Sequence, residues 1–168
     1  MAFELETDRL ALRDLASEDL DAMIAAWTDP DVARLMDDWG PRTATATAAW
    51  LDAAMEARRA DPTGYGCSIV TKDDGVVVGW IGFGRSSRGV ADMDFAYVII
   101  SAYRGKGYAS EALRGVIRYC FDEIGVSSFW GECHVDNTPS ARAMEAAGMR
   151  EIGVVDGQRR FIVGQMQR

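Results

Sequence analysis

Residues 104–109, with the sequence Arg-Gly-Lys-Gly-Tyr-Ala, have the composition of an anion-binding turn. They follow an apolar run, residues 95–100, that predicts a strand, and they precede a helical pattern. The first amides of a helix lack internal partners, and the helix dipole adds partial positive charge there. The glycines let the main chain approach a ligand closely, and Arg104 and Lys106 add charge. The segment therefore predicts a site for a phosphorylated cofactor, with a simple tight turn as the alternative.

The helical pattern after this turn has a single apolar face, which predicts a helix packed on a sheet. The face consists of Leu113, Val116, Ile117, Cys120, Phe121 and Ile124, with Gly125 as the expected C-cap. Residues 128–135 then alternate as a second strand. Strand, helix and strand in this order predict a right-handed crossover with parallel pairing.

The remaining segments predict an α+β fold, in which an antiparallel meander joins this crossover. Strands are expected at residues 10–13, 65–71, 76–84 and 93–100. Helices are expected from Ser17 as N-cap, from Asp29 and Pro30 to about Met36, over residues 43–59, and from Thr138 and Pro139 to Gly148. Asp156 and Gly157 predict the turn of a last hairpin.

Composition limits the class of protein and its partners. Acidic residues number 26 against 18 basic ones, and the net charge of −8 disfavours nucleic acid. The same charge suits a cationic substrate, and a merely soluble acidic surface explains it equally well. The three cysteines are widely spaced, which excludes a disulfide framework and a CxxC zinc site, so no metal is expected. No apolar run is long enough to span a membrane, and we expect a cytoplasmic protein.

Two segments carry a resemblance to a known family. Arg104, Gly107 and Ala109 match the Gln/Arg-x-x-Gly-x-Gly/Ala motif of the GNAT superfamily of acyl-CoA-dependent N-acetyltransferases. Residues 137–149 resemble the second conserved block of that superfamily, and residues 6–13 resemble the opening strand of the branch that acetylates ribosomal-protein N-termini at alanine or serine. The resemblance covers nearly the whole chain in the right order. It implies one acyl-CoA N-acyltransferase domain over residues 1–168, with a mixed central sheet of about seven strands and flanking helices.

The resemblance also implies where acetyl-CoA binds. In this family two central parallel strands separate at their ends, and the cofactor lies in the gap. The main chain of Val98, Ile99 and Ile100 would hydrogen-bond the pantetheine arm, and Asn137 would contact it from the other side. The pyrophosphate would be held by Arg104, Gly105, Lys106, Gly107, Tyr108 and Ala109. For Asn137, a role as a plain turn or helix-start residue is the alternative.

Acetyl transfer to an amine needs a neutral amine, a polarised thioester carbonyl and a proton for the leaving thiolate. Many relatives carry a tyrosine as proton donor at the position of Met144, whose thioether cannot donate. Ser140, one helical turn earlier, is the nearest replacement, although serine in a first turn often only satisfies main-chain groups. Tyr97 and Tyr103 fall outside the matching position.

Asp94 and Glu132 are candidates for the general base, because relatives often have carboxylates near these positions. Solvent-exposed strand charge is the alternative for each. His134, the only histidine, would share a strand face with Glu132 and Trp130, and a structural role is the more typical one for such a residue.

These observations predict an N-acetyltransferase that transfers acetyl from acetyl-CoA to a primary amine by direct attack in a ternary complex. The acceptor would be a protein N-terminal amine or a small-molecule amine. Two other functions fit the same residues: a non-catalytic acyl-CoA-binding module, and an aminoglycoside-type antibiotic acetyltransferase. Acceptor specificity is expected in residues 17–59 and in the last hairpin. Because members of the superfamily often dimerise, the resemblance also implies a homodimer.

Overall fold

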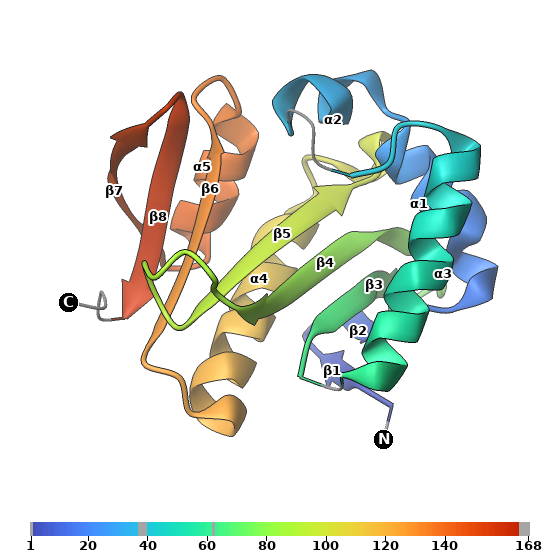
Figure 1. Cartoon of the computed structure of the whole chain (residues 1–168), viewed down its shortest axis with the longest axis horizontal. Helices are drawn as coiled ribbons and strands as arrows, with labels where there is room; N and C mark the ends of the chain where they lie inside the picture. The colour runs from blue at the N-terminus through green and yellow to red at the C-terminus, as the bar shows by residue number, and fades with distance from the viewer. Residues whose placement is uncertain (1, 37–39, 62, 165–168) are drawn as a thin grey trace.

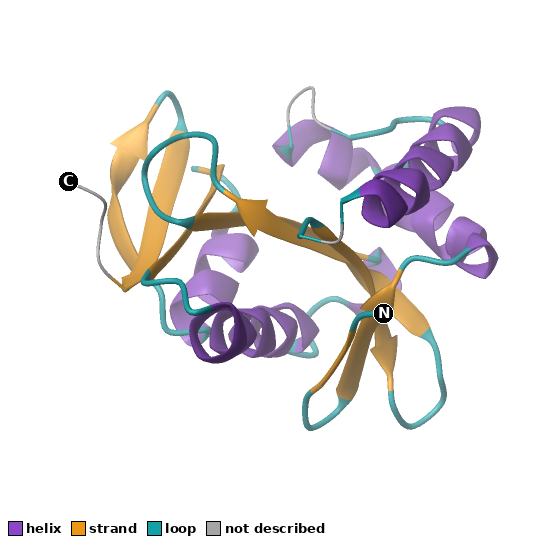
Figure 2. Ribbon diagram, turned by 60° about the horizontal axis from the view of Figure 1, so that its bottom comes forward, coloured by secondary structure: helices purple, strands orange, loops and turns teal. Residues whose placement is uncertain are grey.

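The computed structural model describes residues 2–36, 40–61 and 63–164, and these form one mixed sheet with helices on both faces (Figures 1 and 2). The sheet of the described residues has eight strands in the order β1-β2-β3-β4-β5-β6-β8-β7. The strands are β1 (Glu4–Glu6), β2 (Leu10–Asp14), β3 (Tyr65–Thr71), β4 (Val77–Arg85), β5 (Met93–Ile99), β6 (Ser128–His134), β7 (Arg150–Val155) and β8 (Gln158–Gly164). Neighbouring strands are antiparallel except for β5 and β6, which are parallel, as the strand–helix–strand pattern predicted.

Five α-helices cover the sheet in the described part of the chain. They are α1 (Leu20–Trp27), α2 (Pro30–Leu35), α3 (Ala44–Ala60), α4 (Tyr108–Tyr119) and α5 (Thr138–Ala146). Figure 2 shows α1–α3 on one face and α4 and α5 on the other. Asp29, Thr43 and Asn137 cap α2, α3 and α5, each through a side-chain oxygen that accepts from a main-chain amide in the first turn.

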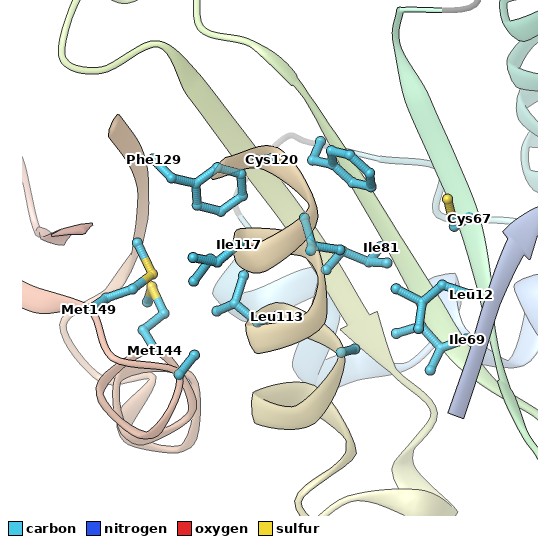
Figure 3. Close-up of a cluster of buried hydrophobic side chains, with 14 of the residues drawn as sticks. Leu12, Cys67, Ile69, Ile81, Leu113, Ile117, Cys120, Phe129, Met144 and Met149 are labelled. Atoms are coloured by element: carbon cyan, nitrogen blue, oxygen red, sulfur yellow. The ribbon is translucent and has the colours of Figure 1, made fainter. Parts of the chain in front are cut away.

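The main hydrophobic core lies between the sheet and α4 (Figure 3). Leu113 of α4 is completely buried, and Ile117 is 8% exposed. They pack in one cluster with Ile81 of β4 and with Met144 and Met149 around α5. Each fully buried side chain of this size contributes about 1.5–3 kcal/mol. The apolar face that was read from the sequence therefore fixes α4, and with it the turn at its N-terminus.

A second core holds α1–α3 against the opposite face of the sheet. Three indoles meet there: the ring centroid of Trp27 lies 5.3 Å from that of Trp50 and 5.5 Å from that of Trp80. Trp80 comes from β4 and packs with Val98 of β5 in this cluster. The three helices are thus anchored directly over β4 and β5.

A buried ion pair closes the N-terminal corner of this second layer. The Asp19 side chain is 1% exposed and accepts two hydrogen bonds of 2.8 Å from Arg13, one of 2.6 Å from the Ser68 hydroxyl and one of 3.0 Å from the Ala16 amide. Burial favours the neutral acid, but these bonds outweigh it and lower the pKa of Asp19. Strands β2 and β3 are thereby tied to the start of α1.

The sheet of the described residues has eight strands, in agreement with the mixed sheet of about seven that was expected, and the additional strand is the three-residue β1. The structure corrects two expectations from the sequence. Ser17 does not cap α1: a 3-10 turn occupies Ser17–Asp19, and α1 begins at Leu20. The apolar face after the turn does not lie on one α-helix, since Cys120–Ile124 form a π-helical turn before Gly125 ends the segment at a φ of 77°.

Candidate active site

Strands β5 and β6 form a wedge in the middle of the sheet. They pair only at Met93 with Phe129 and at Asp94 with Trp130. Beyond that point β5 stays with β4 up to Ile99, and β6 stays with β8, so the two strands move apart toward their C-terminal ends (Figure 1). A cleft of about 1470 Å³ follows this gap. It exceeds the ~300–1,000 Å³ of a typical small-molecule pocket, which leaves room for two substrates.

The edge of β5 presents main-chain groups to this cleft. The Ile100 amide donates to the Val78 carbonyl at 3.0 Å, on the side of β4. Amides alternate in direction along a strand, so those of Tyr97 and Ile99 face the cleft, whereas that of Val98 faces β4. Among the three residues predicted to bind pantetheine, Ile99 keeps an open amide, and the amide of Ile100 is already used by the sheet. Tyr97 supplies the second open position, which the sequence motif did not indicate.

The turn between β5 and α4 has the shape of an anion site. Gly105 and Gly107 have φ angles of 76° and 79°, a left-handed conformation that favours glycine. Gly107 is the N-cap of α4 and has no side chain with which to cap it. The amides of residues 107–110 therefore have no partner within the helix. Tyr108 and Ala109 line the cleft together with both glycines, so this turn fits a diphosphate.

Both cations of this turn already have partners within the protein. The Arg104 guanidinium donates to the Ile99 carbonyl at 3.0 Å and to Asp29 at 3.0 Å, and it lies 3.6 Å from the Asp31 carboxylate. Its charge is thus shared with helix α2. The Lys106 ammonium lies 5.4 Å from the centroid of the Tyr103 ring. The main-chain amides are left as the principal donors of the turn.

A pair of hydroxyl groups lies at the cleft on the side of α5. The Tyr97 Oη and the Ser140 Oγ are 2.9 Å apart, and both residues line the cleft. Burial raises the pKa of Tyr97 to about 12, so the phenol stays protonated at neutral pH. The Cys133 thiol, which also lines the cleft, donates to the Asn137 carbonyl at 3.8 Å, and burial raises its pKa. Met144 is completely buried in the core and does not reach the cleft.

Asn137 combines the two roles that the sequence left open. Its Oδ1 accepts from the Ser140 amide at 3.2 Å, which is the helix-start role. It also lines the cleft, opposite β5, where a pantetheine contact was predicted. His134 is not among the described residues that line the cleft. Its Nδ1 accepts a hydrogen bond from the Asp136 amide at 3.2 Å.

The two candidate bases differ in their partners. Both Glu132 oxygens are engaged by guanidinium groups, one by Arg88 and the other by Arg160 at 3.3 Å. Asp94 is half-buried at the point where β5 and β6 separate. Burial raises the pKa of Asp94, and a hydrogen bond from Ser86 and the charge of Arg88 only partly offset this. Asp94 is therefore the better proton acceptor.

Asp94 and the hydroxyl pair lie on opposite faces of the sheet. Side chains alternate along β5, so Asp94 shares a face with Val98 and the α1–α3 layer. Tyr97 shares the other face with Phe95, whose ring stacks on it at 6.2 Å, and with the α4–α5 layer. A group held in the gap between β5 and β6 would have a carboxyl on one side and hydroxyls on the other.

Two negative findings concern the described residues only. No group of three or more histidine, cysteine, aspartate or glutamate side chains there could hold a metal ion. No helix in the same part of the chain is long and apolar enough to cross a bilayer.

Known acetyltransferases are similar to this chain in sequence and in fold. The uncharacterised N-acetyltransferase p20 of Bacillus licheniformis is 26% identical over 151 residues, which make up 90% of this chain and 84% of that protein. The solved structure of a GNAT-family acetyltransferase from Bacillus anthracis has a TM-score of 0.83 at 24% identity and covers 96% of this chain and 98% of its own. A candidate ribosomal-protein-serine acetyltransferase from Vibrio cholerae has a TM-score of 0.77 at 18% identity and covers 97% and 98%.

The family assignment rests on the sequence pattern rather than on the fold alone. The pattern that defines the acetyltransferase (GNAT) domain matches residues 9–150, which include β5, the 104–109 turn and α5. The wedge between β5 and β6 and the glycine-capped start of α4 are the structural counterparts of that pattern. The chain therefore belongs to the GNAT family and is an acetyl-CoA-dependent acetyltransferase.

Proposed function

We propose that this enzyme acetylates a primary amine by direct attack on the thioester, with Asp94 as general base and Ser140 with Tyr97 as proton donors. The observation that carries the proposal is the placement of these groups on the two faces of the sheet, at either side of the gap between β5 and β6. We further propose that residues 1–168 act as one domain in the cytoplasm. The acceptor is a protein N-terminal amine or a small-molecule amine.

The cofactor lies along the gap in this proposal. The amides of residues 107–110 bind the diphosphate, because they have no partner in α4. The pantetheine arm extends the sheet along the β5 edge and meets the main chain of Tyr97 and Ile99. Asn137 lies across the gap from that edge. The thioester then reaches the point where β5 and β6 separate, beside Asp94.

The acceptor approaches from the face of α1–α3, where Asp94 lies. Its nitrogen must be neutral to attack the thioester carbon, and Asp94 takes the proton that the amine loses. An α-amine has a pKa of about 7.7–8.0, against about 10.4 for lysine. An N-terminal amine therefore needs less help from the base than a lysine side chain does.

The thiolate leaves on the opposite face. As the carbon–sulfur bond breaks, the sulfur takes the proton of the Ser140 hydroxyl. Ser140 in turn takes the proton of the Tyr97 phenol across the 2.9 Å hydrogen bond. Solvent later returns a proton to Tyr97. This relay does not need a tyrosine at position 144.

The test is a panel of acceptors with acetyl-CoA. It includes peptides that begin with alanine or serine, small primary amines and aminoglycosides. Release of free thiol and a mass increase of one acetyl group on the acceptor would support the proposal. If acetyl-CoA raises the melting temperature but no amine releases thiol, the protein is a binding module and the proposal is wrong.

A further inference from the structure

We propose that Arg9 is a positioning residue for acetyl-CoA: it holds the 104–109 turn so that the Gly107 amide points at the bound diphosphate. The inference rests on the cofactor site proposed above. Arg9 lies in the link between β1 and β2, far from the turn in sequence.

Arg9 contacts the turn and the start of α4 at several points. Its Nη1 donates to the Lys106 carbonyl at 2.9 Å. Its guanidinium lies over the Tyr108 ring, 4.9 Å from the centroid. A Cβ placed on Gly107 would come within 3.4 Å of its Nη2. The guanidinium group therefore borders the turn on the side of the Lys106 carbonyl.

The bond to the Lys106 carbonyl has a direct consequence for the next amide. The Lys106 carbonyl and the Gly107 N–H belong to one trans peptide unit, in which the two groups point in opposite directions. Because Arg9 fixes the carbonyl on its own side, the Gly107 N–H must point to the other. With a φ of 79°, Gly107 then directs the following amides of α4 the same way.

Arg9 is itself held rigidly by the helix that it supports. Its Nε donates to Glu111 at 2.6 Å, and its main-chain amide donates to the same carboxylate at 2.8 Å. The Thr7 hydroxyl donates a third hydrogen bond, of 2.6 Å, to the Glu111 carboxylate. These bonds outweigh burial and lower the pKa of Glu111. Gly115 allows this close approach, since a Cβ there would lie 2.8 Å from the Thr7 methyl group.

The bonds to Glu111 indicate that Arg9 orients the turn rather than attracts the phosphate charge. Its positive charge is paired with a carboxylate, so little of it is available to attract a phosphate. Orientation of the turn is the remaining contribution. An ammonium group lacks the planar fork that reaches Glu111 and Lys106 together, so lysine should not replace Arg9.

The test compares two acetyl donors, acetyl-CoA and S-acetylpantetheine, which lacks the diphosphate and the nucleotide. For Arg9→Ala we expect KM for acetyl-CoA to rise about tenfold with kcat within about twofold of wild type. With S-acetylpantetheine, kcat/KM should stay within about twofold of wild type. Calorimetry with coenzyme A should show the same tenfold loss of affinity.

Two further variants separate orientation from charge and from general stability. Arg9→Lys keeps the charge and should lose as much affinity as Arg9→Ala. Lys72→Ala removes an exposed ion pair with Glu6 at the end of β1 and a bond to the Thr7 carbonyl in the β1–β2 link, both away from the turn. Kinetics with both acetyl donors should stay unchanged in this variant. Full rescue by lysine would overturn the orientation role and show that charge alone matters.

The remaining outcomes distinguish this inference from the proposed site. If the wild-type enzyme uses both donors equally well, the turn does not bind the diphosphate, and both the proposed diphosphate site and the role of Arg9 are wrong. If the wild type prefers acetyl-CoA and Arg9→Ala keeps that preference, only the role of Arg9 is wrong. An equal loss with both donors would also contradict it, because it would show a general structural defect.

Discussion

Tyr97 and Ser140 are separated by 43 residues in the sequence, and their hydroxyl oxygens lie 2.9 Å apart. The first stands on β5 and the second in the first turn of α5, so the pair spans the gap between β5 and β6. This chain therefore has a phenol at the cleft that comes from Tyr97 of β5, although the tyrosine of many relatives at position 144 is replaced by methionine.

Ser140→Ala should lower kcat by about 100-fold at saturating acetyl-CoA, because the leaving thiolate loses its direct proton donor. Tyr97→Phe should lower it by a similar factor, and the double variant should be no worse than either single one, since both act on one proton. Steady-state kinetics of thiol release provide the measurement. Additive losses in the double variant would contradict a shared relay.

Asp94→Asn should lower kcat/KM at neutral pH by about 100-fold, because the amide cannot accept the proton of the acceptor amine. The loss should shrink as the pH rises above the pKa of the acceptor, where the amine is already neutral. In the wild type, burial raises the pKa of Asp94, so activity should fall on acidification at a pH above the ~3.9 of an ordinary aspartate. A pH profile of kcat/KM for both proteins checks this, and an equal loss at every pH would exclude Asp94 as the base.

Gly107→Val should abolish the rise in melting temperature that acetyl-CoA produces. The substitution forces a β-branched residue into a left-handed φ of 79° and places its Cβ 3.4 Å from Arg9 Nη2, so the turn that presents the amides must shift. Gly75→Val is the matched control, because Gly75 has a φ of 69° in the β3–β4 turn. It should lose stability without losing the response to acetyl-CoA. A normal response in the Gly107 variant would count against the anion site.

Asp19→Ala should destabilise the fold by about 1–3 kcal/mol, because it leaves the buried Ser68 hydroxyl and the Ala16 amide without their acceptor, whereas Arg13 keeps its bond to the Asp14 carbonyl. Since the pKa of Asp19 is lowered in the folded state, its contribution is complete above about pH 3.9 and is lost as the pH falls through the folded value. Urea unfolding at several pH values measures both effects. Glu56→Ala, which removes an exposed pair with Arg59, should cost less than about 1 kcal/mol. Equal losses in the two variants would contradict this ranking.

Local signals in the sequence predicted most of the fold. Asp29 before Pro30 gave the start of α2, and the apolar spacing from Leu113 to Ile117 gave α4 and its buried face. In both cases the deciding interactions lie within a few residues of each other. The prediction that Ser17 caps α1 was wrong. A 3-10 turn precedes α1, and the Asp19 carboxylate, which bonds Arg13 of β2 and Ser68 of β3, sets the start of the helix.

The candidate site was harder to predict, because its side chains meet across long sequence separations. The 104–109 turn could be found from its glycines, and Asp94 from its place on the central strand. The bond between Tyr97 and Ser140, and the approach of Arg9 to Lys106 over 97 residues, depend on how the elements pack. No local pattern encodes such contacts.

Arg104 connects the last carbonyl of β5 to the first turn of α2, which has only six residues. Val32 of this helix is 6% exposed and packs in the second core, and Asp29 and Asp31 add two ion pairs with Arg104. The residue that opens the 104–109 turn is therefore fastened to β5 and to α2 by a single guanidinium group. Loss of that group would release both attachments at once.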